Sequence, residues 1–282
     1  MLKKNSGIAT MYFKLNAQRR YILIGRASII TNRKAMIPYR TGGERERWQA
    51  AFELARLLHA HPEEGVEPGL AQSVIAAFRG SRRGDPAVRR YLCLAVGGLK
   101  AAAALDDLVL ALEDSDPDTR LYAIWGLGAL QDARASPSLL PLLGDAEAGI
   151  RKMTAYALGG IGDLSAAPAL VDLLEDPEGD VRWNAALALA QLGDASGVPI
   201  LLGMADRDRL AQVPGMDERQ RQEVVVNAVR GLGLLMTPEA ADYIGLLSRE
   251  DPSPEVRRVA RELLAEAAGG AGPAPAAGGE TP

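Results

Sequence analysis

Apolar residues along the chain recur with the spacing of helices that each bury one stripe. The pattern is clearest in four segments, at 85–99, 116–130, 150–163 and 181–194. In each of them apolar side chains follow the i, i+3, i+4, i+7 order of an amphipathic helix. Shorter apolar runs lie between these segments, and Pro137 and Pro168 stand near the start of two of them. A proline is tolerated in a first helical turn. The pattern therefore predicts an all-α protein of paired helices.

The four segments are copies of one repeat. Each has an arginine near its start, and these are Arg89, Arg120, Arg151 and Arg182, spaced by 31 residues three times in succession. Weaker copies begin at Arg47, Val225 and Arg257, which gives seven arginine-position helices and six shorter partner helices. A helix pair of this size cannot bury its apolar face alone, so the pairs must stack. We predict one right-handed α-solenoid of about six to seven hairpins over residues 44–268.

The step from residue 182 to residue 225 exceeds the repeat by 12 residues. The extra sequence, around 206–223, is charged and contains the turn-forming run VPGM. Insertions in repeat proteins are usually tolerated as surface loops. We expect this one to protrude at one rim, either as a plain insertion or as a lip that grips a partner.

The repeats resemble the HEAT-repeat superfamily, and within it the short repeats of the phycobilisome-lyase-like branch. Runs such as VRWNAALALAQLGD (181–194) carry this resemblance. It implies that the arginine-bearing helices line a concave face and that Asp and Arg side chains at the turns form a hydrogen-bond ladder between repeats. The expected ladder residues are Asp85, Arg89, Asp116, Arg120, Arg151 and Arg182.

One enzyme with similar repeats, deoxyhypusine hydroxylase, carries His-Glu pairs at two positions of its inner helices to hold two irons. The corresponding pairs here are Trp48-Gln49, Arg90-Tyr91, Leu121-Tyr122, Lys152-Met153, Trp183-Asn184 and Val226-Asn227. None of them is His-Glu, and the chain has only two histidines. An oxidoreductase of this type therefore stays a remote third interpretation of the function.

Other signs of catalysis or of a metal site are weak. The sequence has no glycine-rich phosphate loop, no H-E-x-x-H and no C-x-x-C. His59 and His61 precede Glu63 and Glu64, which suggests a metal site, but histidines at a helix end before a proline are more often a solvated cap. Cys93 lies among apolar neighbours and is expected in the core. We predict no catalytic residue, no metal and no cofactor.

The charge is distributed unevenly along the chain. Residues 1–43 hold nine Lys or Arg and no acid, 269–282 form a Gly/Pro/Ala-rich tail expected to be disordered, and the body, 44–268, has a net charge of −12. The leader has three interpretations, namely a mitochondrial presequence, a basic arm, or sequence ahead of a true start at Met36, and we favour the last. The acidic body argues against nucleic acid and would suit a basic partner.

Compartment and membrane association follow from simpler features. A single cysteine cannot form an internal disulfide, so a reducing compartment such as the cytoplasm is expected. No apolar stretch reaches the 18 residues or so that a membrane span requires.

Aromatic residues gather at three positions of the repeat, which lie one, two and five residues after the arginine position. We call each of these positions, followed from repeat to repeat, a column. With 3.6 residues per turn, side chains in these columns should point away from the buried stripe. Seven of the 13 aromatics of the chain lie there, namely Trp48, Phe52, Tyr91, Tyr122, Trp125, Tyr156 and Trp183. They either fill the seams between neighbouring helices or form an exposed ladder, which we favour because Tyr and Trp often anchor interfaces. Asn184 and Arg230 would add polar contacts.

We therefore predict a non-catalytic scaffold or adaptor that binds another protein or a peptide on its concave face. The resemblance adds an alternative from another class, a bilin lyase-like protein that holds a tetrapyrrole in the aromatic groove.

Overall fold

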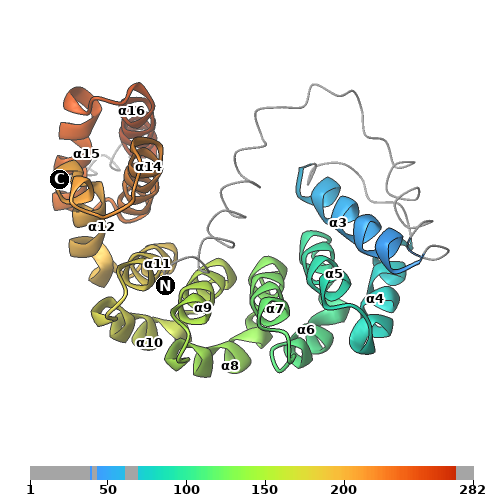
Figure 1. The fold of residues 1–282 in the computed structure, drawn as a ribbon. Coiled ribbons are helices and arrows are strands. Elements are labelled where there is room, and N and C mark those ends of the chain that lie inside the picture. The colour runs from blue at the N-terminus through green and yellow to red at the C-terminus, as the bar shows by residue number, and fades with distance from the viewer. Residues whose placement is uncertain (1–38, 40–42, 61–68, 271–282) are drawn as a thin grey trace, which may run out of the picture. The chain divides into compact units, whose positions relative to one another are not determined.

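A computed structural model describes residues 39, 43–60 and 69–270 of the chain (Figure 1). Within these residues every regular element is helical, with 14 α-helices, so the predicted all-α class is confirmed. The chain divides into two compact units, Met1–Asp163 and Leu164–Pro282, which are described separately below. The leader, apart from residues 39 and 43, lies outside the described residues, as do residues 271–282 of the tail.

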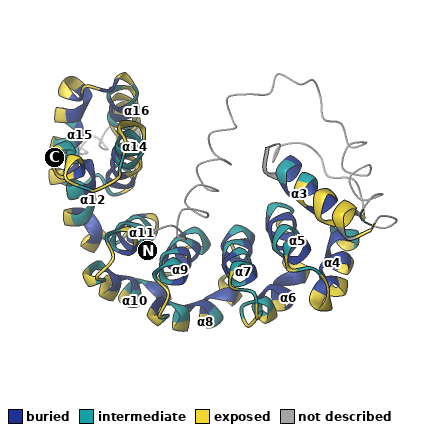
Figure 2. Ribbon diagram, viewed as in Figure 1, coloured by how far each residue is buried: buried dark blue, intermediate teal, exposed yellow. Residues whose placement is uncertain are grey.

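The first unit consists of two layers of helices (Figure 1). One layer contains the arginine-bearing helices α3 (Glu44–Ala60), α5 (Pro86–Gly98), α7 (Pro117–Leu130) and α9 (Ala148–Ile161), each packed on the next. The other contains the partner helices α4 (Leu70–Gly80), α6 (Leu105–Ala111) and α8 (Ser136–Leu139), the last continued by a 3-10 turn, Leu140–Gly144. Figure 2 shows buried residues, coloured dark blue, where the two layers face each other.

The second unit repeats this arrangement. Its arginine-position helices are α11 (Gly179–Gln191), α14 (Glu218–Leu235) and α16 (Pro254–Gly270), and its partner helices are α10 (Ala167–Asp172), α12 (Val198–Ala205) and α15 (Pro238–Glu250). A short extra helix, α13 (Arg207–Ala211), follows α12. The described residues thus contain the seven arginine-position helices and six partner helices that the repeat predicts.

Three arginine-position helices of the first unit, α5, α7 and α9, end in the same way. Lys100 and Gln131 adopt left-handed backbone conformations at φ 48° and 55°, and Gly162 takes the equivalent place at φ 78°. The Lys100 ammonium donates to the Gln131 side chain at 2.8 Å, and the Gln131 amide donates to the Gly160 carbonyl at 3.2 Å. These bonds link the ends of α5, α7 and α9, so side chains replace the usual glycine and connect successive repeats.

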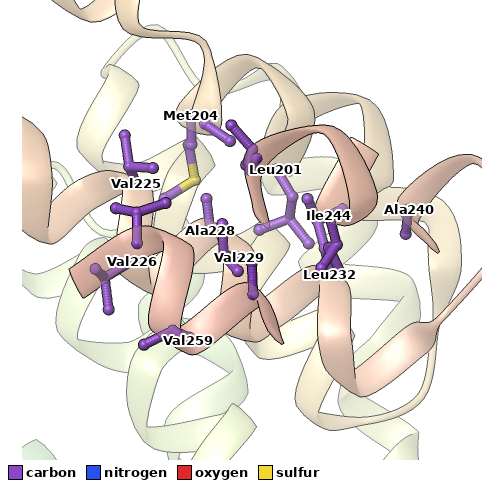
Figure 3. Packing of buried hydrophobic residues seen from close by; sticks show 14 of the residues in the cluster. Leu201, Met204, Val225, Val226, Ala228, Val229, Leu232, Ala240, Ile244 and Val259 are labelled. Atoms are coloured by element: carbon purple, nitrogen blue, oxygen red, sulfur yellow. The ribbon is translucent and has the colours of Figure 1, made fainter. Parts of the chain in front are cut away.

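A continuous apolar core holds the second unit together (Figure 3). Leu201 and Met204 of α12 pack with Val225, Val229 and Leu232 of α14, all nearly inaccessible to solvent. Ile244 of α15 and Val259 of α16 complete the same cluster. Burial of this many aliphatic side chains accounts for the stacking of helix pairs that are individually too short to be stable.

The expectation that the insertion protrudes as a loop is wrong. Leu210 of α13 is 1% exposed, and Val213 and Met216 pack against the core of the second unit. The Arg207 guanidinium makes two 2.8 Å hydrogen bonds with the Asp251 carboxylate, which lies before α16. The burial of these apolar side chains and the Arg207–Asp251 ion pair together stabilise the ordered insertion. Their contribution exceeds the conformational entropy that a free loop would retain.

Candidate partner-binding surface

Most of the repeat arginines fix the turn that precedes their own helix. Arg120, Arg151 and Arg182 each donate from Nη1 to the backbone carbonyl six residues earlier, at 3.0, 2.8 and 2.6 Å. The acceptors are Asp114, Asp145 and Asp176, and the carboxylate of each also accepts the backbone N–H two residues onward. These three bonds to backbone carbonyls thus lie within one helix pair each. Arg120 also approaches Glu147 of the next repeat, at 3.7 Å.

Arg89 connects its repeat to the next one through a buried ion pair. It is 7% exposed and binds the Asp114 carboxylate through Nε and Nη2, both at 2.8 Å, while Nη1 donates to the Gly84 carbonyl at 2.6 Å. Its neighbour Arg90 binds the Asp116 carboxylate at 2.8 and 2.6 Å. Adjacent arginines of α5 therefore hold two aspartates at the start of α7.

The predicted ladder aspartates are helix caps. The Asp85 carboxylate accepts from the Ala87 N–H at 2.9 Å, and the Asp116 carboxylate from the Thr119 N–H at 2.8 Å, each ahead of a proline. The aspartates that accept hydrogen bonds from the repeat arginines were not predicted from the sequence. They are Asp114, Asp145 and Asp176, and their own spacing of 31 residues was the signal that could have found them.

Asp116 should make stability depend on pH. Hydrogen bonds from Arg90 hold the pKa of Asp116 far below its usual range. A depressed pKa contributes stability that is present above the ordinary value, near 3.9, and is lost as the pH falls below it. We expect Asp116→Asn to flatten the loss of stability between about pH 5 and pH 2. Urea titrations over this range would measure it, with exposed Asp106→Asn as the control, and equal slopes for both variants would contradict the assignment.

Four aromatic rings form a contiguous cluster on the arginine-bearing layer of the first unit. We call Trp48, Phe52, Tyr91 and Tyr122 the aromatic surface. Ring centroids are 6.0 Å apart for Trp48 and Tyr91, 5.1 Å for Phe52 and Tyr91, and 6.2 Å for Tyr91 and Tyr122. Trp48 and Phe52 keep 38% and 41% of their surface exposed, whereas Tyr91 and Tyr122 are half-buried. The rings thus pack on one another across α3, α5 and α7 and still meet solvent.

Other aromatics of the same columns are more enclosed. Trp125 is half-buried, and its ring lies 3.0 Å from the position that a Cβ at Gly97 would occupy, so the glycine makes room for the ring. Tyr156 on α9 is also half-buried. Leu121 and Met153 occupy two of the same columns and are buried. The columns therefore lie along the seams between helices, and exposure varies from one repeat to the next.

The remaining predicted residues belong to the second unit. Trp183 is half-buried and packs against the core of that unit, while Asn184 donates to the Asp180 carbonyl at 2.8 Å. Arg230 on α14 is exposed.

Groups with a potential for chemistry are sparse. Burial raises the pKa of the Cys93 thiol, which lies in the core of α5 and is therefore not poised as a nucleophile. Burial, with Tyr91 and Asp118 nearby, raises the pKa of Tyr122, so its hydroxyl is a neutral hydrogen-bonding group. In the part of the chain that is described, no three His, Cys, Asp or Glu side chains gather as a metal site would require. The side chains of His59 and His61 lie outside it.

None of the described helices combines the length and the apolar character needed to cross a membrane.

Comparisons with known proteins agree with the repeat architecture. The family described as HEAT repeats matches residues 75–157 and 137–214. A chain of the complex of CpcE and CpcF of phycocyanin lyase from Nostoc sp. PCC7120 has a similar fold, with a TM-score of 0.59 and 23% identity, over 88% of this chain and 98% of that one. The Escherichia coli protein YibA is similar at a TM-score of 0.50 and 13% identity, over 94% and 99%. No curated protein sequence matches. By its 31-residue period, its paired helices and the matching family, the chain is a HEAT-repeat protein.

Proposed function

We propose that this protein is a non-catalytic scaffold that binds another protein, or a peptide of it, through the aromatic surface. One observation carries the proposal. Four rings from three successive helices contact each other, yet Trp48 and Phe52 remain more than a third exposed. Seam filling alone would not require large apolar rings at the solvent boundary. The similar chain from Nostoc belongs to a complex of two proteins, which is compatible with a protein partner here.

The arrangement suits binding for energetic reasons. Aromatic side chains bury large areas on association and have few rotatable bonds, so they lose little entropy. Here the rings already hold each other in tilted and edge-on contacts, which reduces that cost further. Trp125 and Tyr156 would extend the surface along α7 and α9. The binding roles of Trp183, Asn184 and Arg230, which belong to the second unit, stay predictions. The cytoplasm and a basic partner stay predictions from composition and charge.

Truncating the exposed rings should weaken partner binding without unfolding the protein. We expect Trp48→Ala and Tyr91→Ala each to weaken binding by at least tenfold, about 1.4 kcal/mol, because interface aromatics are typical anchors. Partners would be captured from native lysate with the full chain, and the dissociation constant of the main one would be measured by calorimetry. The control is Leu164→Ala, which removes an apolar side chain that is 67% exposed in the second unit.

Circular dichroism must show unchanged helicity in each variant before binding is compared. Affinities of the two aromatic variants within twofold of the wild type would contradict the proposal and leave the rings as seam filler. An equal loss in Leu164→Ala would show that binding does not depend on the aromatic surface.

A second candidate function is chromophore handling of the bilin lyase type. It is favoured by the likeness to a chain of the phycocyanin lyase complex over nearly the whole of that chain, together with the aromatic surface, on which a flat tetrapyrrole could stack. Titration with biliverdin separates the two candidates. A saturable shift of the visible band that is lost in Tyr91→Ala supports chromophore handling, and an unchanged spectrum supports the scaffold.

A further inference from the structure

The second unit contains a hollow on the partner-helix layer, away from the arginine-position helices. It has a volume of about 580 Å³ and lies between α12 and α15. Pro199, Leu202 and Gly203 line it from α12, and Tyr243 and Leu246 from α15. We call it the α12–α15 groove. Its apolar lining includes Leu246, which is 38% exposed and therefore only partly covered by the protein's own side chains.

A small residue of α12 makes room for one wall of the groove. A Cβ at Gly203 would lie 3.1 Å from Nη1 of Arg209, so the guanidinium of α13 crosses directly over this glycine. Leu202 and Tyr243 pack on their inner sides against the core of the second unit. The floor of the groove is thus fixed by packing, and the pocket is preformed.

The charge of the lining is negative. Asp206, Glu239 and Asp242 contribute three carboxylates, and Arg209 contributes the one cation among the lining residues. Arg209 lies 3.3 Å from Asp206 and compensates it. Glu239 and Asp242, both exposed, have no cationic partner among the residues that the structure describes. Glu239 lies in the first turn of α15, where the helix dipole stabilises it, but Asp242 is further along the helix.

The apolar lining and the negative charge of the groove determine which kind of ligand can bind there. An anion would be repelled by the two uncompensated carboxylates. A purely apolar ligand would strip water from them without supplying a hydrogen-bond donor, which costs free energy. A segment that places a Lys or Arg beside an apolar side chain satisfies both the carboxylates and the exposed Leu246.

We propose that the α12–α15 groove is a second docking site, which takes a short segment of a partner protein with apolar residues flanked by Lys or Arg. The apolar residue enters between Leu202 and Leu246, and the cations pair with Glu239 and Asp242. The site is separate from the aromatic surface, and the proposal does not depend on the scaffold function assigned to that surface.

The test uses the full chain and a defined probe. The probe is a fluorescein-labelled octapeptide in which two leucines are flanked on each side by arginine and lysine, and a twin carries glutamate at the basic positions. Fluorescence anisotropy should show saturable binding of the basic peptide and none of the acidic twin. Binding should weaken at least tenfold in Glu239→Gln/Asp242→Asn and on raising NaCl from 50 to 500 mM, because exposed ion pairs are screened.

Matched controls separate a built site from general attraction to an acidic protein. Asp172→Asn/Glu175→Gln removes the same charge from exposed positions at α10 in the same unit and should leave binding unchanged. Leu246→Ser should weaken binding at least fivefold without a change in net charge. An equal loss in both double variants, or no loss in Leu246→Ser, would overturn the proposal in favour of nonspecific charge attraction.

The basic leader of the chain itself is the competing occupant. The full chain would be treated with a carbodiimide and analysed by mass spectrometry. A cross-link between a lysine of residues 1–38 and Glu239 or Asp242 would show that the leader occupies the groove. That result would overturn the proposal of a partner segment as occupant. Trp48→Ala and Tyr91→Ala should bind the octapeptide as the wild type does. Failure of the scaffold function and failure of the groove proposal are therefore distinguishable.

Discussion

Replacing Arg89 with methionine is expected to lower the free energy of unfolding by about 3 kcal/mol. Arg89 is buried, and its partner Asp114 has a side chain that is only 14% exposed. Removing one member of a buried ion pair leaves the other charge uncompensated, which costs roughly 3 to 5 kcal/mol. The residual exposure of Asp114 places the effect at the lower end, since water can reach part of the carboxylate. Methionine preserves most of the volume, so the cavity contribution stays small.

Arg182 provides the matched control. It occupies the same position of the repeat but is half-buried and donates to the Asp176 and Pro177 carbonyls. Arg182→Met should therefore cost only about 1 kcal/mol, the usual net value of a hydrogen bond. Urea unfolding followed by circular dichroism would measure both, and the double variant Arg89→Met/Asp114→Leu should recover part of the loss. Equal losses for Arg89→Met and Arg182→Met would show that the Asp114 pair adds nothing.

A second large effect is expected at Gly128, where α7 approaches α9. A Cβ added at Gly128 would lie 2.8 Å from the Cα of Ala157 and 2.9 Å from its Cβ, closer than such atoms come in proteins. Gly128→Ala must push the two helices apart, and overpacking of this kind costs roughly 1 to 3 kcal/mol. Because the clash is with the backbone of α9, which cannot rotate away, we expect about 3 kcal/mol.

Gly160 on α9 is the control. The nearest atom to a Cβ there would be the Gly128 carbonyl oxygen at 3.6 Å, an ordinary contact. Gly160→Ala should therefore be neutral or stabilise the protein by up to about 0.5 kcal/mol, because alanine favours the helix. Urea unfolding of both variants would measure the difference. A Gly128→Ala variant as stable as Gly160→Ala would mean that the seam between α7 and α9 is looser than the structure shows.

The candidate site could be predicted only in part, because the sequence gives the direction of a side chain on its helix but not how far the neighbouring helix covers it. The helical period identified the columns that hold Trp48, Tyr91 and Trp125, because side-chain direction along a helix follows from its geometry. It could not separate the exposed Trp48 from the enclosed Trp125, since exposure depends on the neighbouring helix, here on the space above Gly97. The prediction of a protruding loop for the insertion was wrong for the same reason. The composition of the insertion is typical of a loop, but Leu210 and Arg207 contact residues that are distant in sequence.

The sequence by itself determined the class of fold and the 31-residue period, because both rest on local periodicity. Only the tertiary structure decided that Arg89 reaches Asp114 of the next repeat, whereas Arg182 donates to carbonyls of the turn before its own helix. It also decided that α12 and α15 enclose an acidic groove. Contacts of this kind join residues from different helices, so their free energy depends on how the helices pack and not on the local sequence pattern.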